Sequence, residues 1–586
     1  MRVLPFLVVA LLPPLAIAGQ EPLQAFRGEL GDAVGFGAHA LADCRENLPL
    51  AVHFVDARAD DGDPGSLRDV LTNAVADSTY DIVMFDYGGI LELDDGALSP
   101  EVECVYVAGQ TAPGDGIVLW APNNSYLSFI VPRDLVFRYV RSRIHGGMRG
   151  LEFRGGLNLI VDHTTVSWFD GFGGGHVMFQ VRAFESACGT TSPCIENVTV
   201  SNNMIYEPNE TRPLVWRFGT ATDDEGTLRS TSLSVTRNFT SLGWRQPKVS
   251  GADSVRVANN IVYNWTNRAG SVNTNIGVDF VENLYREGPD INGQTNRRTR
   301  MVQVRSADIG SKRLHLHGNR TIHNGYVRLV DQDSIWGIEG DAWQIVCNAT
   351  ENGCVENDPA PTSMRSLTPY PPAPVPEYGD MTDALHDEIL DGVGVSRLLN
   401  CDGTVRPARD ATDADRISRY NAGESPPDSL MDGTQHGVNL SNIDVPGMGY
   451  SAGTPCARTS DGLWHDWLST NGFDPQDPPS ADSVTADGYL LVEHQINALP
   501  LASEGAAPTW TGRWVYTADV IPFAGFRMPD VAFPARRAWY SNDNQEALVV
   551  SCSDQGTALT AAQVVSWISE NMLEAPDIEN ETATIC

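Results

Sequence analysis

The sequence is poor in basic residues: 40 lysines and arginines stand against 75 aspartates and glutamates, which gives a formal net charge of −35. A surface of this sign repels nucleic acids and anionic membranes, so neither is expected as a partner. It also repels an anionic polymer unless the binding site is locally basic or holds a cation. An acidic, lysine-poor surface is equally what a saline habitat favours, so the charge by itself assigns no function.

A long apolar run is also missing: no stretch of about 18 apolar residues, the length that spans a bilayer, follows the N-terminus. The first 18 residues contain Arg2, an apolar run over 3–12, and Ala16-Ile17-Ala18 before Gly19. A basic start, a short apolar core and an A-x-A site are typical of a secretory signal peptide. We therefore expect residues 1–18 to be removed and the mature protein to be a secreted, extracellular monomer.

None of the ten cysteines belongs to a C-x-x-C pair, so a zinc site is not expected. Their number fits an oxidising compartment and disulfide bonds. Cys188 with Cys194, and Cys347 with Cys354, flank short polar loops that a disulfide would close. The last four cysteines are expected to fix the C-terminal part, in pairs that the sequence does not determine; they are Cys401, Cys456, Cys552 and Cys586.

Asn-x-Ser/Thr sequons are numerous and permit N-glycosylation if the host performs it. Several coincide with predicted turns, so chance occurrence in an asparagine-rich chain explains them equally well. The asparagines concerned are Asn123, Asn197, Asn209, Asn238, Asn264, Asn319, Asn348, Asn439 and Asn580.

One pattern recurs along the middle of the chain: an apolar residue, a second apolar residue two positions later, and asparagine five positions after the first. It occurs at Val198, Val200 and Asn203; Leu233, Val235 and Asn238; Val255, Val257 and Asn260; Val278, Phe280 and Asn283; and Leu314, Leu316 and Asn319. The alternation predicts a strand with one buried face, and the asparagine predicts a turn.

Successive asparagines of this pattern are 35, 22, 23 and 36 residues apart. A period of about 22 residues suits one coil of a parallel β-solenoid, and the longer gaps suit coils with a loop insertion. Stacked coils would bring the asparagines into a hydrogen-bonded ladder. An antiparallel sandwich with asparagine-rich turns is the alternative, but it does not explain the constant register.

The remaining elements are predicted from local signals. Residues 19–64 are expected to cover the end of the solenoid, and Gly65–Leu71 to form a short capping helix with Ser66 as N-cap. Residues 359–376 are proline-rich and predict an extended linker or a strap along the solenoid. Further strands are expected at Ile82–Phe85, Val105–Ala108 and Leu135–Val140, and further helices at Asp383–Asp391, Arg409–Tyr420 and Ala561–Leu573.

Several segments match one family in residues and in order. They are Gly35-Phe36-Gly37-Ala38, the run VAGQTAPGDGI from Val107 to Ile117, Arg138-Tyr139-Val140-Arg141, Val161-Asp162-His163, Val166-Ser167-Trp168, Arg409-Asp410-Ala411 with Asp413-Ala414 and Arg416, and Asp461-Gly462-Leu463-Trp464. The chain thus resembles secreted pectate lyases over roughly residues 25–500.

The resemblance implies an all-β fold, a right-handed parallel β-helix with a short N-terminal capping helix and an irregular C-terminal extension. The domains expected are a signal peptide (1–18), the β-helix (19–358), a strap with a family-like C-terminal segment (359–500) and an extension of unknown role (501–586). It also implies cleavage of polygalacturonate or a related acidic polysaccharide by β-elimination, usually with calcium.

The resemblance further implies a base. The family uses an arginine in an R-x-P motif, and Trp244-Arg245-Gln246-Pro247-Lys248 occupies that place. Arg245 is therefore the candidate base, and Lys248 a candidate to hold the substrate carboxylate. Because arginine is normally protonated, this role needs a neighbouring cation or transient proton loss. Arg217 is a further candidate contact for a sugar carboxylate. The alternative interpretation is that Arg245 and Lys248 are solvated residues on the solenoid surface without a catalytic role.

The implied metal site departs from the family pattern. Arg149 stands where an aspartate is usual, Asp170 retains the first acidic ligand, and Gly174 occupies the position of the second. One carboxylate is a poor Ca²⁺ site, because calcium takes six to eight oxygens. Two hypotheses follow: a weakened site completed by Asp162, Glu152, Glu185 or the substrate, or a calcium-independent enzyme in which Arg149 replaces the cation.

The Asp162-His163 pair lies on the strand before this loop. Asp162 is a candidate metal ligand and His163 a candidate substrate contact, although a buried Asp-His pair more often orients a turn. The leading functional hypothesis is a polysaccharide lyase, and the alternative is a β-helix that binds glycans without cleaving them. A hydrolase, which needs two carboxylates flanking the bond, is less favoured because no such pair occurs on a matched coil.

Overall fold

The computed structural model describes residues 34–48, 50–75, 78–93, 96–121, 125–144, 150–169, 178–183, 185–188, 194–208, 216–220, 230–266, 269–272, 276–290, 302–305, 313–323, 326–330, 346–350, 353–359, 366–374, 376–400, 405–427, 430, 438–455, 515–517, 536–541 and 546–551. The predicted signal peptide, the helix predicted at 561–573 and the four C-terminal cysteines lie outside these residues. Within them, no helix is long and apolar enough to cross a membrane.

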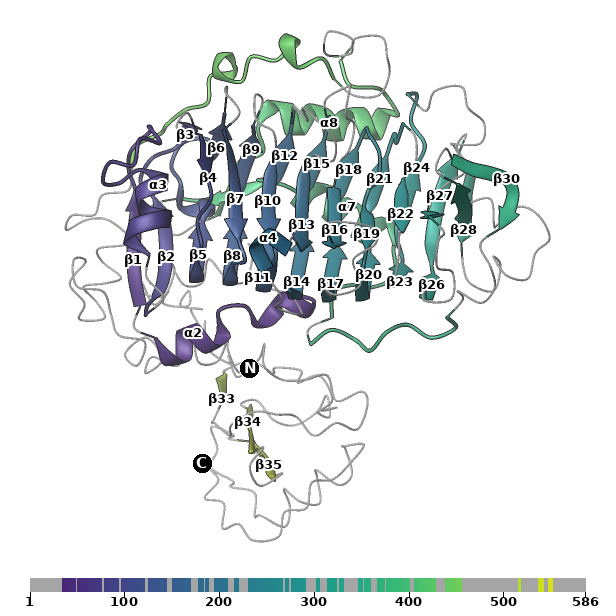
Figure 1. Cartoon of the computed structure of the whole chain (residues 1–586), viewed down its shortest axis with the longest axis horizontal. Helices are drawn as coiled ribbons and strands as arrows, with labels where there is room; N and C mark the ends of the chain where they lie inside the picture. Colours follow the sequence, from purple (N-terminus) through teal and green to yellow (C-terminus); the bar gives the residue numbers. More distant parts are fainter. Residues whose placement is uncertain are drawn as a thin grey trace, which may run out of the picture.

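Three ten-stranded sheets form the body of the molecule, and the chain visits them in turn, so that each circuit adds one strand to each sheet (Figure 1). Sheet 1 consists of β1 (Leu50–Val55), β2 (Tyr80–Phe85), β5 (Glu103–Ala108), β8 (Arg133–Arg138), β11 (Gly156–Asp162), β14 (Ile195–Ser201), β17 (Ser230–Thr236), β20 (Ala252–Ala258), β23 (Gly277–Val281) and β26 (Arg313–His317).

The other two sheets are built in the same way. Sheet 2 consists of β3 (Gly89–Glu92), β6 (Ile117–Trp120), β9 (Val140–Arg143), β12 (Thr165–Ser167), β15 (Met204–Tyr206), β18 (Phe239–Ser241), β21 (Ile261–Tyr263), β24 (Leu284–Arg286), β27 (Asn319–His323) and β28 (Tyr326–Val330). Sheet 3 consists of β4 (Ala97–Leu98), β7 (Tyr126–Ile130), β10 (Leu151–Arg154), β13 (Phe179–Ala183), β16 (Trp216–Thr220), β19 (Lys248–Ser250), β22 (Gly270–Val272), β25 (Val302–Arg305), β29 (Val346–Thr350) and β30 (Gly353–Pro359).

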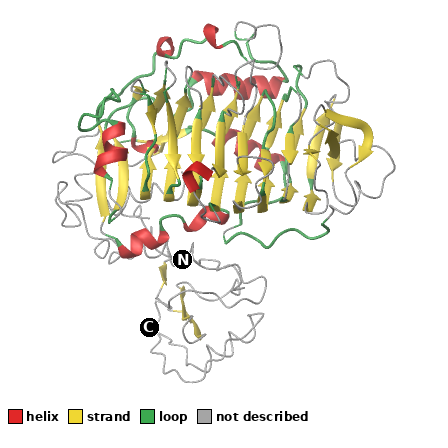
Figure 2. Ribbon diagram, in the orientation of Figure 1, coloured by secondary structure: helices red, strands yellow, loops and turns green. Residues whose placement is uncertain are grey.

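The strand pairs of the three sheets are parallel except at the end of the stack. There β28 pairs antiparallel with β27, and β30 pairs antiparallel with β29. The fold is therefore an all-β parallel β-helix, as the repeat predicted, and strands dominate it throughout (Figure 2). A separate antiparallel sheet joins β33 (Val515–Thr517), β34 (Arg536–Ser541) and β35 (Glu546–Ser551).

The repeated apolar pairs explain the stacking. The first residues of the pairs, Val198, Leu233, Val255, Val278 and Leu314, lie opposite one another on neighbouring strands of sheet 1, and so do the second ones. Both rows point inward and are buried in a common core. On sheet 3, the rings of Phe129, Phe153, Phe179 and Phe218 form a further row, with centroids 5.2 to 6.2 Å apart.

The five repeated asparagines form the predicted ladder at the turn between sheets 1 and 2. The side-chain Nδ2 of each of the first four donates to Oδ1 of the asparagine on the next coil, over 2.9 to 3.0 Å, so that the ladder runs from Asn203 to Asn319. Each Nδ2 also donates to a strand carbonyl of the preceding coil, such as Val235 for Asn260. All five asparagines are buried, so the ladder satisfies polar groups that water cannot reach.

One predicted strand needs correction. Leu135–Val140 is not continuous, because β8 ends at Arg138 and β9 begins at Val140. Tyr139, between them, has φ +57°, a left-handed conformation that turns the chain from sheet 1 to sheet 2. His163 and Asn202 have the same conformation at the matching turns. The apolar character of the segment masked this single-residue turn.

The N-terminal segment also needs correction, because residues 34–48 lie along the outer face of sheet 1 and do not cover its end. They comprise a 3-10 turn, η2 (Phe36–His39), and helix α2 (Ala42–Asn47). The Gly37 amide donates to Thr199 Oγ1 over 2.9 Å. A Cβ at Gly37 would lie 2.5 Å from the Leu159 carbonyl oxygen, so only glycine permits this approach.

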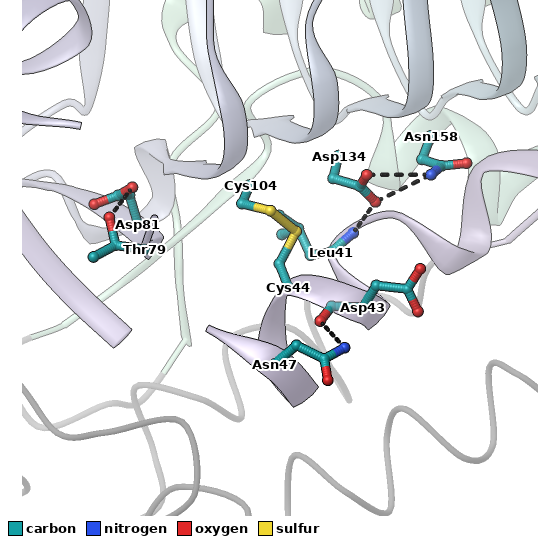
Figure 3. The surroundings of a disulfide bond; sticks show 9 residues. All are labelled: Leu41, Asp43, Cys44, Asn47, Thr79, Asp81, Cys104, Asp134 and Asn158. Carbon is teal, nitrogen blue, oxygen red and sulfur yellow. Dashed lines mark hydrogen bonds between the residues drawn. A yellow bond between two sulfur atoms is a disulfide. The ribbon is translucent and has the colours of Figure 1, made fainter. Parts of the chain in front are cut away.

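A disulfide and a carboxylate hold α2 against the solenoid (Figure 3). Cys44 of α2 is bonded to Cys104 of β5. Asp134 accepts hydrogen bonds from the Leu41 amide and from Asn158 Nδ2, each over 3.2 Å. The sequence did not indicate the Cys44–Cys104 bond, because its partners are 60 residues apart.

The other local predictions can be compared directly. The Cys188–Cys194 disulfide is confirmed, beside helix α4 (Glu185–Cys188). Ser66 caps a short helix, α3 (Leu67–Asp69), by accepting from the Asp69 amide, and a π-helical turn, η3 (Val70–Ala74), continues it. Cys347 and Cys354 lie on the paired strands β29 and β30, but their side chains are not described, so their disulfide stays a prediction.

Of the strap predicted at 359–376, residues 360–365 and 375 lie outside the described residues; residues 366–374 and 376–379 do form a strap. The Ser366 amide donates to the Leu314 carbonyl, and the Tyr370 amide to Asp279, on β26 and β23. Glu377 then pairs with Arg256 of β20 over 2.9 Å. The strap therefore crosses successive strands of sheet 1.

The chain continues from the strap onto sheets 1 and 2. Helices α7 (Asp383–Gly392) and α8 (Ala411–Ala422) agree with their predicted positions within a few residues. Tyr420 of α8 packs its ring against Phe239 and Tyr263 of sheet 2, and α8 runs along this side of the stack in Figure 1. A hairpin of β31 (Arg397–Leu399) and β32 (Val405–Pro407), and the short turns η4 (Gly109–Thr111), η8 (Leu440–Asn442) and η9 (Pro446–Met448), complete the described elements.

A largely buried set of charges, here called the clamp, fastens α8 to sheet 2. It consists of Arg141 and Arg143 of β9 with Asp410 and Asp413 at the start of α8. Arg143 Nη2 lies 2.7 Å from Asp410 and 3.0 Å from Asp413. Burial alone would raise the pKa of Asp410, but the two guanidiniums hold it below its usual range.

Candidate active site

The basic candidates belong to a row of polar positions on sheet 3. Ser128, Glu152, Gln180, Arg217, Lys248 and Ser271 pair in register on six neighbouring strands. The residues next to them, such as Phe153 and Val249, point into the core. Because strand side chains alternate, the polar row occupies the outer side of the sheet, with about 4.8 Å between successive positions.

Glu152 lies at the acidic end of this row. Its carboxylate accepts hydrogen bonds from Ser128 Oγ over 2.7 Å, from Arg154 Nε over 2.9 Å and from Gln180 Nε2. A carboxylate only accepts, so these contacts fix Gln180 with its Nε2 toward Glu152. The carboxylate is therefore paired with a guanidinium and two neutral donors.

Lys248 and Arg217 lie next to each other at the basic end of the row. Lys248 is the first residue of β19. It pairs with Arg217 of β16 on one side and with Ser271 of β22 on the other. Lys248 is buried, with an exposed fraction of 3%. The side chain of Arg217 is not described, and its position rests on the backbone register.

Arg245 lies in the turn that leads from β18 into β19. Its φ is +61°, a conformation that side chains other than glycine rarely adopt. The buried side chain of Gln246 closes the turn by donating to the carbonyls of Leu242 and Gly243, and the Pro247 carbonyl accepts from the Ser271 amide of the next coil. These hydrogen bonds fix the turn, and with it the backbone of the partly exposed Arg245, which lies three residues before Lys248.

Asp162 and His163 lie elsewhere, at the end of β11 in sheet 1. Asp162 accepts from Arg138, His163, Ser201 and Asn202, over 2.6 to 2.9 Å. Burial would raise its pKa, but His163 and Arg138 lower the pKa below the usual range. Burial lowers the pKa of His163. The structure does not bring this pair together with Arg245 and Lys248, which follow sheet 2 and lie on sheet 3.

Arg149 and Asp170 lie outside the described residues, so their roles stay predictions. Among the carboxylates that are described, Glu152 and Asp162 are each bonded to guanidinium groups and several other donors. Within the described ranges, no three His, Cys, Asp or Glu side chains are grouped as a metal site would require. These residues therefore do not fit a Ca²⁺ ion, which needs six to eight oxygen ligands.

The arrangement brings two cationic positions, Arg217 and Lys248, side by side on sheet 3, directly after the turn that holds the partly exposed Arg245 in a left-handed backbone conformation. Such groups suit a ligand with carboxylates and the stabilisation of negative charge. Sequence reasoning missed Gln180 and Gln246, which orient Glu152 and the Arg245 turn. Neither lies in a repeated motif; only their register or turn position could have indicated them.

Comparison with known proteins gives the following matches. No family model matches the chain. The chain is 26% identical over 508 residues to a protein of Emericella nidulans named "Probable pectate lyase C", a match that covers 86% of this chain and 98% of that protein. It is 30% identical over 276 residues to the protein of the same name from Aspergillus flavus, covering 46% of this chain and 55% of that one. Among solved structures, pectate lyase C from Erwinia chrysanthemi covers 62% of this chain and 96% of its own, with 13% identity and a TM-score of 0.37.

Proposed function

We propose that this chain, a pectate lyase-like parallel β-helix protein, is a secreted polysaccharide lyase that cleaves pectate or a related uronate polymer by β-elimination. The similarity that extends over nearly the whole length of the Emericella protein supports the lyase activity. The observation that carries the site assignment is the register of Lys248 with Arg217, directly after the turn that contains Arg245.

The reaction needs a base at C5 of the uronate and a cation on its carboxylate. In the proposed step, the neutral guanidine form of Arg245 takes the C5 proton. The electron pair of that C–H bond forms the C4–C5 double bond while the C4–O4 bond breaks, and the departing O4 takes a proton from water. Lys248 and Arg217 bind the carboxylate and stabilise the negative charge that develops next to it.

A lyase assay tests this proposal, because the conjugated unsaturated product absorbs ultraviolet light. We expect absorbance to rise on polygalacturonate or on methyl-esterified pectin. No rise on either polymer, with or without added calcium, would contradict the proposal. Binding of the polymer without any rise would instead support a glycan-binding protein that does not cleave.

The role of Arg245 is tested by the substitution Arg245→Ala. We expect kcat/KM to fall by about 10²–10⁴-fold, the usual contribution of a proton-transfer group. The midpoint of thermal unfolding should change little, because Arg245 is partly exposed in a turn. Arg237→Ala is a matched control: Arg237 is also a partly exposed arginine in a turn, with φ +56°, but lies between sheets 1 and 2. Equal loss of activity in both variants would contradict the assignment.

A second question is which cation, Ca²⁺ or the Arg149 guanidinium, helps to neutralise the substrate carboxylate. Ca²⁺, when bound, would neutralise the substrate carboxylate and favour loss of the C5 proton. We propose Asp170 as its contact on the protein, or Arg149 as its replacement. An assay with excess chelator separates these proposals: activity that persists in chelator and is lost in Arg149→Ala supports Arg149, and activity that requires added calcium and is lost in Asp170→Ala supports the metal.

A further inference from the structure

The sequons differ in whether the side-chain nitrogen of the asparagine, Nδ2, donates a hydrogen bond within the folded protein. Asn238 and Asn319 belong to the buried ladder, where each Nδ2 donates to a strand carbonyl. Asn264 is buried as well, and its Nδ2 donates to Asp290 over 2.7 Å. The Nδ2 of Asn197 donates to Asn158 on the neighbouring coil. In these four sequons the nitrogen that would carry a glycan is already bonded.

Asn439 is different. It immediately precedes η8, and its Oδ1 accepts both the Ser441 amide, over 3.0 Å, and the Ser441 hydroxyl, over 2.6 Å. Its Nδ2 donates to no residue in the described part of the chain. Asn439 is partly exposed and Ser441 is exposed. The serine of the sequon therefore polarises the amide through its oxygen while the nitrogen stays available.

Burial excludes a glycan at Asn238, Asn264 and Asn319. An attached sugar replaces one of the two amide hydrogens and must extend into solvent. In the ladder it would break hydrogen bonds in a space without water, where each lost bond costs about 1–3 kcal/mol. Asn439, in contrast, lies at the surface. The two groups that hydrogen-bond to its side chain, the amide and the hydroxyl of Ser441, both bind Oδ1 and not Nδ2.

We propose that Asn439 is an N-glycosylation site and that Asn238, Asn264 and Asn319 are not modified. The donor is an oligosaccharide linked to a polyprenyl pyrophosphate. The bond between the anomeric carbon and Nδ2 forms, the bond from that carbon to the pyrophosphate oxygen breaks, and Nδ2 loses one proton as the pyrophosphate leaves. The inference rests on the predicted passage through a secretory pathway, and it does not depend on lyase activity.

The test is secretion of the full chain from a yeast host, followed by removal of N-glycans with a glycoamidase in ¹⁸O water and peptide mass spectrometry. We expect labelled aspartate at position 439, and unlabelled asparagine at 238, 264 and 319. An unmodified Asn439 peptide in the secreted protein, or label at any of the three buried positions, would overturn the inference.

Variants give an independent readout. Asn439→Gln and Ser441→Ala should each remove the same glycan mass, because one removes the acceptor nitrogen and the other the hydroxyl of the sequon. Asn442→Gln is the control, since Asn442 is an exposed asparagine in the same turn without a sequon. A chain that is glycosylated at Asn439 but inactive on uronate polymers would contradict only the proposed function.

Discussion

At the residue scale, single polar side chains hydrogen-bond to the backbone of segments that are neither helix nor strand and so fix their conformation. Gln246 closes the turn that contains Arg245, and Asp134 accepts the Leu41 amide beside the Cys44–Cys104 disulfide (Figure 3). Each of these side chains binds a backbone group that a strand would otherwise pair. Their effect is to hold irregular segments in one position, which a candidate base and a docked helix both require.

Asp134 predicts a measurable pH dependence. Burial raises its pKa from 3.8 to about 6, and the nearby Asp43 and Glu103 add to this rise. The folded state therefore binds the proton more tightly than the unfolded state, so the carboxylate destabilises the fold above this pKa. Relative to Asp134→Asn, the free energy of unfolding of the native protein should rise as the pH falls from about 6 toward 3.8.

Urea unfolding at several pH values checks this. Asp63→Asn serves as the control, because Asp63 is an exposed carboxylate on a loop. A difference between the native protein and Asp134→Asn that stays constant over this pH range would contradict the assignment.

At the element scale, the asparagine ladder stabilises the turn between sheets 1 and 2. Asn260 donates to Asn283 and to the Val235 carbonyl, and its Oδ1 accepts from the amide and side chain of Asn238. Because all these groups are buried, removing one amide leaves several of them without partners.

Asn260→Ala should lower the free energy of unfolding by about 3 kcal/mol or more, since each buried unpaired group costs about 1–3 kcal/mol. Chemical denaturation gives this value, and Asn442→Ala, at an exposed position, should change it little. A loss at Asn260 no larger than at Asn442 would show that the ladder does not stabilise the fold.

At the scale of the whole molecule, the segment from the strap to α8 contributes to the free energy of unfolding of the β-helix domain. The clamp buries two arginines of sheet 2 whose counter-charges come from residues about 270 positions later in the chain. Asp413 accepts from Arg143, Thr165 and Tyr206, and all four side chains are buried. A solenoid without this segment would expose sheet 2 and leave the arginines without carboxylates.

Asp413→Ala should therefore destabilise the protein by about 3–5 kcal/mol, the usual cost of removing one partner of a buried ion pair. Asp415→Ala on the same helix is the matched control: that carboxylate is 40% exposed and pairs with Arg419 at the surface and with Arg416, which keeps the buried Glu207 as its partner, so we expect a loss below about 1 kcal/mol. Thermal and urea unfolding measure both. Equal losses would mean that the clamp contributes no more than a surface pair.

Sequence alone determined the features that repeat or that depend on near neighbours. The alternating apolar pairs and the asparagine five residues on predicted both the stack of coils and the ladder, because the same local geometry recurs on each coil. The Ser66 cap of α3 and the Cys188–Cys194 bond were likewise predicted, since each joins residues only a few positions apart.

Only the tertiary structure decided what is distant in the chain. The Cys44–Cys104 bond, the course of residues 34–48 along sheet 1, the clamp and the row from Ser128 to Ser271 all join residues from different coils or from opposite ends of the sequence. Loop insertions of unequal length separate these partners, so no fixed spacing relates them. The stacking of coils sets which residues become neighbours, and it places Asp162, a candidate metal ligand, on sheet 1 and away from the Arg245 turn that leads into sheet 3.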